Sequence, residues 1–202
     1  MLLIGITGGV GAGKTAILNY IRENYNSRIL VADEIAHAQM EPGTACYQTL
    51  SDMFSEEDIF LPEGGFDRLK LAQVIFNDEE KRNRLNTVVH PAVHKYVMEQ
   101  VEAERAADRL DLLVLEAALL IEAGYSDVCD EIWYIYTSRE NRMHRLMESR
   151  GYSKQKTETI MASQLSEEEF RKHCAVEIDN NGTHEESFRQ IDQALFARGI
   201  TK

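Results

Sequence analysis

The stretch GGVGAGKT, residues 8–15, matches the pattern GxxxxGK(S/T) at every fixed position. It follows an apolar run, Leu2–Thr7, and opens a segment with helical character, Lys14–Asn24. Glycines let a backbone turn closely around a phosphate group with its amide hydrogens pointing inward, and the positive end of a helix adds to the attraction. The order of strand, loop and helix therefore predicts a phosphate-binding loop (P-loop) and argues against a chance glycine-rich turn.

Individual residues of this loop have expected roles in binding MgATP. Lys14 would bridge the β- and γ-phosphates, and the hydroxyl of Thr15 would bind Mg²⁺. The residues expected to bind ATP in this stretch are Gly9, Gly11, Ala12, Gly13, Lys14, Thr15 and Ala16. The sequence thus predicts ATP and Mg²⁺ as cofactors.

Two missing motifs narrow the class of P-loop protein. GTPases usually carry an Asn-Lys-x-Asp motif for guanine, which is absent from this sequence. Many motor ATPases are longer and show an apolar run that ends in Asp-Glu, whereas the corresponding run here ends in Glu116-Ala117. A chain of 202 residues with a helical segment after the second expected strand fits a small-molecule kinase better.

The composition excludes other classes of function. Hydrophobic residues make up 44% of the chain and charged residues 28%, which is usual for a soluble globular protein. The formal net charge of -12 argues against a nucleic-acid partner, because a phosphate backbone requires a basic surface. No apolar run is long enough for a membrane span, and the N-terminus lacks the features of a signal peptide. The widely spaced Cys46, Cys129 and Cys174 support neither a disulfide framework nor a zinc site, so we expect a cytoplasmic protein.

Strand-like and helix-like segments alternate along the chain. The expected strands are Leu2–Thr7, 28–33, 111–117, 131–136 and 176–178. Helical patterns separate them, and residues 41–109 contain few strand signals. The pattern predicts an α/β fold with a parallel five-stranded sheet between two layers of helices, as in P-loop proteins.

Five segments in order resemble the motifs of one kinase family. Residues 7–15 are similar to TGG(I/V)GSGK(S/T), and residues 32–43 to the segment AD-x-(I/V)-A-R followed by PG. Within residues 66–91, four short groups of residues match the family's LDR, IF, LN and HP in order and spacing. Residues 119–122 resemble PLLFE, and residues 178–182 resemble IDN-x-G. This ordered set resembles the dephospho-coenzyme A kinases, and it discriminates far better than the P-loop alone.

The resemblance implies transfer of the ATP γ-phosphate to the 3′-hydroxyl of dephospho-coenzyme A, the last step of coenzyme A biosynthesis. It implies a nucleotide-binding core at residues 1–40 and 111–202, with a lid at about 139–173, and a helical substrate-binding insert at residues 41–110. Two alternatives stay open: a P-loop kinase of another small hydroxyl substrate, such as a nucleoside or nucleotide, and a non-catalytic ATP-binding paralogue.

Asp33 and the lid arginines are the candidate catalytic residues beside Lys14. By resemblance Asp33 accepts or orients the proton of the attacking hydroxyl, and its expected place at the carboxyl end of a strand suits that role. The alternative is that Asp33 caps a helix. Phosphoryl transfer also needs cations, which residues 139–150 supply on one segment. The resemblance favours Arg145 and Arg150, and the alternative is an ordinary solvated helix.

Four further residues enter through the resemblance. His90 would lie near the substrate, or it simply precedes Pro91 as the first residue of a helix. Glu122 would contact the substrate, and Glu116 would bind Mg²⁺, through a water molecule if not directly. Asn180 would contact the adenine base, while Asn-Asn-Gly by itself indicates only a turn.

The sequence departs from the family pattern at several positions. Val31 falls inside an expected buried strand, so its effect would be on packing. His37 and Ile160 replace arginines, and the loss of one charge-assisted contact costs about 1.5–3 kcal/mol. The other departures are Glu116, Ala118 and Ala175, whereas Gln164 is retained. These losses are the reason for keeping the paralogue alternative.

Overall fold

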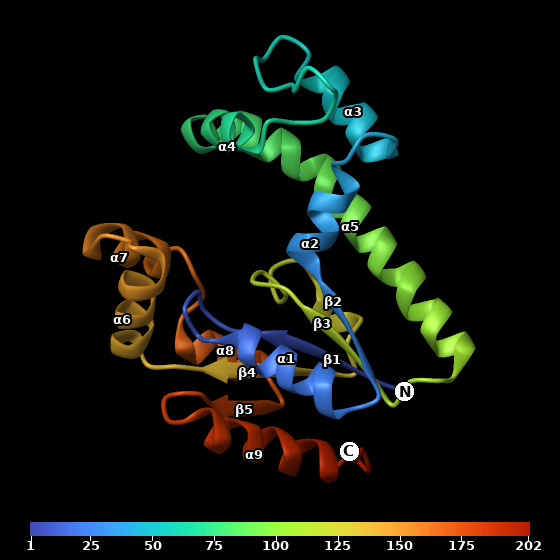
Figure 1. Ribbon diagram of the computed structural model, residues 1–202, viewed down its shortest axis with the longest axis vertical. Helices are drawn as coiled ribbons and strands as arrows, with labels where there is room; N and C mark the ends of the chain where they lie inside the picture. Colours follow the sequence, from blue (N-terminus) through green and yellow to red (C-terminus); the bar gives the residue numbers. More distant parts are fainter. The chain divides into compact units, whose positions relative to one another are not determined.

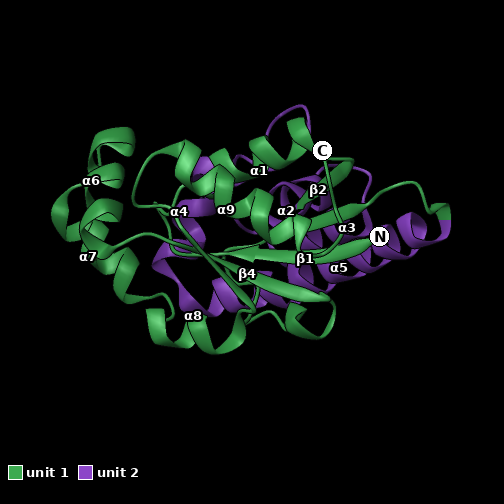
Figure 2. Cartoon of the chain, turned by 90° about the horizontal axis from the view of Figure 1, so that it is seen from below, with its two compact units in different colours: residues 1–30, 107–202 green, residues 31–106 purple.

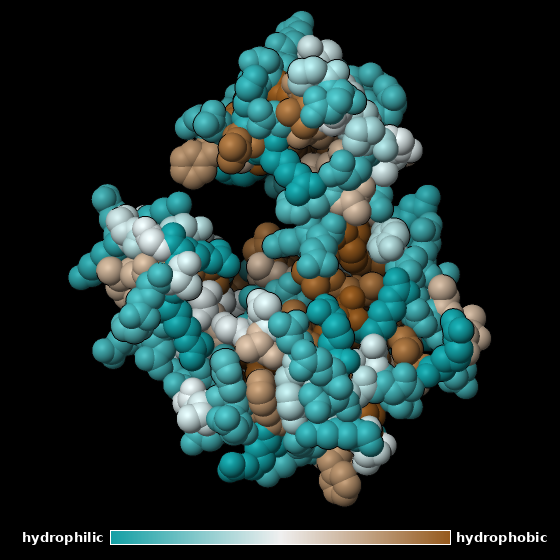
Figure 3. Space-filling model, viewed as in Figure 1, coloured by the Kyte–Doolittle hydropathy of each residue, from teal (hydrophilic) through white to brown (hydrophobic).

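The structure, a computed structural model, describes all 202 residues and divides into two compact units. Unit 1 comprises Met1–Leu30 and Ala107–Lys202, and unit 2 comprises Val31–Ala106 (Figure 2). Most of the surface seen in Figure 3 is formed by hydrophilic residues, with apolar residues in smaller groups. None of the helices combines the length and apolar character that crossing a membrane requires. This division does not show which unit binds which ligand. The nucleotide-binding core, the lid and the substrate-binding insert therefore stay predictions.

Unit 1 contains the sheet, and its strands appear where the sequence shows continuous apolar runs. Its strands are β1 (Leu2–Thr7), β2 (Ser27–Val31, whose last residue opens unit 2), β3 (Leu112–Glu116), β4 (Glu131–Tyr136) and β5 (Val176–Asp179). Its helices are α1 (Lys14–Asn24), the short 3-10 helix η1 (Tyr125–Asp127), α6 (Arg139–Arg150), α7 (Lys154–Ala162), α8 (Glu167–His173) and α9 (His184–Phe196).

The five strands form one parallel sheet in the order β2-β3-β1-β4-β5, which confirms the predicted α/β fold (Figure 1). The central strand β1 pairs with β3 on one side and β4 on the other. Leu3, Ile4 and Ile6 of β1 are fully buried, as a strand covered on both faces requires. Each such side chain contributes about 1.5–3 kcal/mol through burial.

Helices cover both faces of the sheet. Ile17 and Ile21 of α1 and Ile191 of α9 share a buried cluster with Ile4 and Ile6 on one face. On the other face, Phe170 of α8 stacks on Tyr134 of β4 with ring centroids 4.8 Å apart. The result is the predicted three-layer arrangement, and the loop that follows β1 emerges from the centre of the sheet.

Unit 2 is helical, as the sequence predicts. Its helices are α2 (Ala32–Gln39), α3 (Ala45–Met53), α4 (Arg68–Asn77) and α5 (Glu79–Ala107, whose last residue belongs to unit 1). Thr44 caps α3 by accepting a hydrogen bond from the amide of Tyr47, and Asp67 caps α4 in the same way. The buried apolar residues of these helices and the segment between α3 and α4 include Leu50, Phe54, Ile59, Phe66 and Leu71.

The predicted end of the second strand is wrong by two residues. β2 ends at Val31, which is also the N-cap of α2, so Asp33 lies in the first turn of this helix. Asp33 is therefore neither the last residue of the strand nor the helix cap. An acidic residue in the first turn is favoured by the positive end of the helix dipole, and this local preference shortens the strand.

The prediction that a helix begins at Pro91 is also wrong, because Pro91 lies inside the single long helix α5. His90 is thus an exposed mid-helix residue and does not precede a helix. A proline inside a helix removes one backbone hydrogen bond and costs about 3 kcal/mol. The apolar positions Leu85, Val89, Val93, Val97 and Val101 continue through it with helical spacing, and all are buried. Burial of this continuous face outweighs the lost bond.

Replacing Pro91 with alanine is expected to stabilise the protein by roughly 1–3 kcal/mol, because the new amide restores a helical hydrogen bond at an exposed position. Urea denaturation followed by circular dichroism measures the change. Pro62→Ala, in an exposed turn, is the control and should not stabilise the protein. A lower unfolding midpoint for Pro91→Ala than for the unmodified protein would contradict this account.

Candidate active site

The loop after β1 presents backbone amides at the start of α1. Gly13 is the N-cap of α1 in the left-handed conformation, with φ 85°, and it supplies no side-chain cap. The first turn of α1 carries no acidic residue. The amides of Gly11 and Gly13 donate to no acceptor within the protein, while that of Ala12 donates to the carbonyl of Gly9 at 3.0 Å. Such a helix start is a ready anion site, as the sequence motif predicts.

Lys14 is held beside the loop. Its Nζ donates to the carbonyl of Gly8 at 2.9 Å and lies 3.4 Å from Oε1 of Glu116. Both side chains are largely buried, with 13% and 12% of their surfaces exposed. Glu116 ends β3 in register with Ile6 of β1, which explains why this carboxylate lies next to the loop.

The carbonyl oxygen of Ala12 is the meeting point of three side chains. It accepts hydrogen bonds from Asn180 Nδ2 at 2.7 Å, Thr137 Oγ1 at 3.0 Å and Arg145 Nη1 at 3.3 Å. Because the peptide is trans and planar, the amide of Gly13 points the opposite way from these donors. The three side chains thereby fix the direction in which one of the predicted phosphate-binding amides points.

Asn180 is more deeply buried than the sequence indicates. Its side chain bonds to Ala12 and accepts from Ser187 Oγ at 2.7 Å, and the residue is 1% exposed. Arg145 Nη2 donates to the Asn180 carbonyl at 2.8 Å. The turn after β5 is therefore joined to the P-loop, a link that Asn-Asn-Gly in the sequence does not reveal. Contact of Asn180 with an adenine base stays a prediction.

Two further lid residues also contact the loop: Arg142, one of the cations expected on residues 139–150, and Gln164. Arg142 Nε donates to the Val10 carbonyl at 2.9 Å, and the Val10 amide donates to Gln164 Oε1 at 3.1 Å. The sequence predicts Arg142 as a cation of the lid and Gln164 as a retained family residue, but it does not predict that both contact Val10. Arg150, which the resemblance favoured, is exposed beside Gly151 and makes none of the hydrogen bonds to the loop.

The remaining predicted residues lie on different elements. Thr15 is exposed in the first turn of α1, and Glu122 is exposed in the turn after β3, both in unit 1. Asp33 and His90 belong to unit 2, where both are exposed. The Asp33 carboxylate makes no hydrogen bond or ion pair within the protein, so it is free to accept a proton from a ligand.

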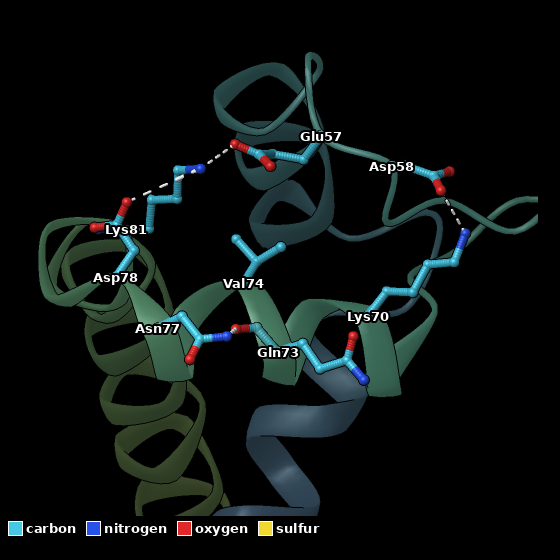
Figure 4. A pocket seen from close by; sticks show the side chains of 8 residues that line it. All are labelled: Glu57, Asp58, Lys70, Gln73, Val74, Asn77, Asp78 and Lys81. Atoms are coloured by element: carbon cyan, nitrogen blue, oxygen red, sulfur yellow. Dashed lines mark hydrogen bonds and ion pairs between the residues drawn. The ribbon is translucent and has the colours of Figure 1, made fainter.

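Unit 2 contains a further open cavity of about 580 Å³ (Figure 4). Its lining residues are Glu57, Asp58, Lys70, Gln73, Val74, Asn77, Asp78 and Lys81. Lys70 lies 2.7 Å from Asp58, and Lys81 forms an ion pair with Glu57. Hydrogen bonds to these carboxylates raise the pKa of both lysines. Since the lysine charges are already balanced, this cavity offers no anion site comparable to the P-loop.

Comparison with known proteins gives the family. The family model "Dephospho-CoA kinase" matches residues 2–186. The dephospho-CoA kinase of Geobacter sulfurreducens is 38% identical over 193 residues, covering 96% of each chain, and that of Corynebacterium diphtheriae is 34% identical over 202 residues, covering 100% of this chain and 99% of the relative. The chain belongs to the dephospho-CoA kinase family. The resemblance drawn from the motifs is confirmed, and with it the prediction of a kinase.

Solved structures share the fold of this chain. TT1252 from Thermus thermophilus superposes with a TM-score of 0.80 at 29% identity, covering 98% of this chain and 97% of the other. The dephospho-CoA kinase from Campylobacter jejuni gives a TM-score of 0.72 at 20% identity, with 98% of each chain covered. Shikimate kinase from Acinetobacter baumannii, at 15% identity and a TM-score of 0.51 over 98% of this chain and 94% of the other, shares the fold alone.

Gly13→Ala should weaken MgATP binding by at least about tenfold and destabilise the protein, because a Cβ there would lie 2.5 Å from Asn180 Nδ2. Gly124→Ala is the matched control: Gly124 has φ 76°, but a Cβ would meet nothing within 4 Å. It should show only the backbone strain of about 1–2 kcal/mol. Calorimetric titration with MgATP and urea denaturation measure both effects, and equal losses in the two variants would refute the packing argument.

Proposed function

We propose that the chain transfers the γ-phosphate of ATP to the 3′-hydroxyl of dephospho-coenzyme A, giving coenzyme A and ADP. The observation that carries the proposal is the P-loop: its Val10 and Ala12 carbonyls accept hydrogen bonds from side chains, while the amides of Gly11 and Gly13 stay available. Membership of the dephospho-CoA kinase family supplies the acceptor, since full-length relatives carry that name.

In this proposal the P-loop binds the triphosphate. Gly9, Gly11, Ala12, Gly13, Thr15 and Ala16 line the phosphates, and Lys14 leaves the Gly8 carbonyl to bridge the β- and γ-phosphates. Arg145 contributes positive charge near the loop, since its hydrogen-bond partners in the protein are neutral. We also assign Arg150 to phosphate binding, on the family resemblance alone. These cations would stabilise the charge that moves during phosphoryl transfer.

The residues present also fit a magnesium ion. Thr15 offers an exposed hydroxyl in the first turn of α1, and Glu116 offers a carboxylate beside Lys14. Oxygen ligands of this kind are those that Mg²⁺ prefers. When bound, the ion would neutralise charge on the β- and γ-phosphate oxygens.

The acceptor side of the reaction is assigned to three residues named by the family resemblance. The 3′-hydroxyl oxygen attacks the γ-phosphorus, the bond from that phosphorus to the bridging oxygen breaks, and ADP leaves. Asp33, exposed and without a partner in the protein, takes the hydroxyl proton. His90 and Glu122 are assigned to substrate binding by resemblance. On the same resemblance we propose residues 41–110 as the substrate-binding insert, residues 1–40 and 111–202 as the nucleotide-binding core, and residues 139–173 as its lid.

A coupled assay of ADP release tests the proposal. The purified protein should consume ATP with dephospho-coenzyme A and leave nucleosides and nucleotides unphosphorylated. Turnover with a nucleoside or nucleotide in preference to dephospho-coenzyme A would identify a different kinase. Binding of ATP without transfer to any acceptor would identify the non-catalytic paralogue, and either result would reject the proposal.

Asp33→Asn should lower kcat by about 10²–10⁴-fold, because the amide cannot accept the hydroxyl proton. The affinity for MgATP should stay unchanged. Glu34→Gln is the control, since Glu34 is an exposed carboxylate in the same helical turn. Steady-state kinetics and calorimetry with both variants separate turnover from binding, and full turnover by Asp33→Asn would remove Asp33 from the mechanism.

A further inference from the structure

Arg142, in the first turns of α6, is the most deeply buried arginine near the P-loop, with 7% of its surface exposed. Its Nε donates to the Val10 carbonyl at 2.9 Å, and its Nη2 donates to Gln164 Oε1. The same Gln164 oxygen accepts from the Val10 amide at 3.1 Å. Arg142 and Gln164 together engage both backbone polar groups of Val10. This arrangement is called the Val10 clamp below.

The guanidinium of the Val10 clamp has no counter-ion. Its hydrogen-bond partners are a backbone carbonyl and a neutral amide, whereas Arg198 of the same unit, also partly buried, lies 2.6 Å from the carboxylate of Glu131. Desolvation by burial lowers the pKa of Arg142, and only Tyr134 and Glu167 act in the opposite direction, without bonding to it. A buried charge without a partner is destabilising. A compensating anion is therefore expected.

Gly9 shows how closely the guanidinium lies against the loop. A Cβ at this position would fall 2.1 Å from Arg142 Cζ, so only glycine leaves room for the arginine. Since Gly9 does not have the positive φ of Gly11 or Gly13, its requirement is space and not backbone conformation. The loop sequence is thus matched to Arg142 as well as to phosphate.

One nitrogen of Arg142 remains available. Nη1 makes no hydrogen bond, yet it is not among the buried unpaired side-chain atoms, which are only Thr7 Oγ1 and Ser51 Oγ. Nη1 therefore keeps access to solvent at the edge of the loop. It is a donor on a fixed, positively charged group, which is the type of group that binds phosphate oxygens best.

We propose that Arg142 is a further nucleotide-binding residue: its free Nη1 binds a phosphate oxygen of ATP, and Gln164 holds it against the P-loop. Gln164 is suited to this positioning role because it accepts both hydrogen bonds and leaves the arginine charge intact. This inference rests on the proposed function, since it requires that the loop bind ATP.

Gln164→Glu tests the inference without breaking the Val10 clamp. The carboxylate can accept the same two hydrogen bonds, so the fold should hold or gain stability, but its charge cancels that of Arg142. We expect the Kd for MgATP, measured by calorimetry, and the KM for ATP to rise at least about tenfold. The KM for dephospho-coenzyme A should not change. Gln155→Glu, the same charge change at an exposed position of α7, should leave all three values unaltered.

Arg142→Met provides the second test. It removes the charge but keeps an apolar side chain at a buried position, so thermal unfolding should show a folded protein with MgATP affinity reduced as in Gln164→Glu. Unchanged ATP affinity in folded Arg142→Met or in Gln164→Glu would overturn the inference. If the unmodified protein itself fails to bind ATP, the proposed function fails. If it turns over dephospho-coenzyme A while both variants bind ATP normally, only the role of Arg142 is rejected.

Discussion

The carbonyl oxygen of Ala12 is the atom on which the arrangement of the site depends. Thr137 follows β4, Asn180 follows β5 and Arg145 lies on α6, yet all three donate to this oxygen. Each neutral bond contributes about 0.5–1.5 kcal/mol and the charged one about 1.5–3 kcal/mol. Parallel strands bring these donors together because their carboxyl ends meet at one edge of the sheet. The same contacts therefore join β4, β5 and α6 to the P-loop and fix the conformation of the loop.

Outward-pointing carbonyls explain the chemistry of the loop. A peptide whose carbonyl is held on one side must present the next amide on the other, so fixing Val10 and Ala12 by their oxygens directs the following amides away from the side chains that hold them. No rearrangement of the backbone is then needed when an anion arrives. Preorganised amides of this kind are worth far more to binding and transition-state stabilisation than flexible ones. The helices and turns around the loop thus set the directions of the backbone amides that are proposed to bind the nucleotide.

Sequence patterns predicted those features that depend on neighbouring residues. The P-loop, the strands β1, β3, β4 and β5, and the helix boundaries at Ser138 and Gly151 follow from local apolar runs and capping residues. The prediction at Pro91 was wrong because it used a local rule, the preference of proline for the first position of a helix. Burial of the apolar face of a 29-residue helix outweighs that preference. Arg142 and Gln164 contact Val10 across 132 and 154 residues of sequence, so local patterns predicted a group of lid arginines and a retained glutamine but not this contact.

A net charge of -12 would by itself repel a triphosphate. The distance between most of the negative charges and the P-loop explains why binding is still compatible with this charge. Charges separated by more than about 8–10 Å in solvent are largely screened at physiological salt, so most of the surface carboxylates act weakly on the site. Arg142 is buried and Arg145 half-buried, and both bond only to neutral groups, so their charges are screened less than those on the surface. Elsewhere, several acidic residues pair with lysines, as Asp58 with Lys70 and Glu57 with Lys81 in unit 2. Which cations are left unpaired therefore matters more for nucleotide binding than the total charge.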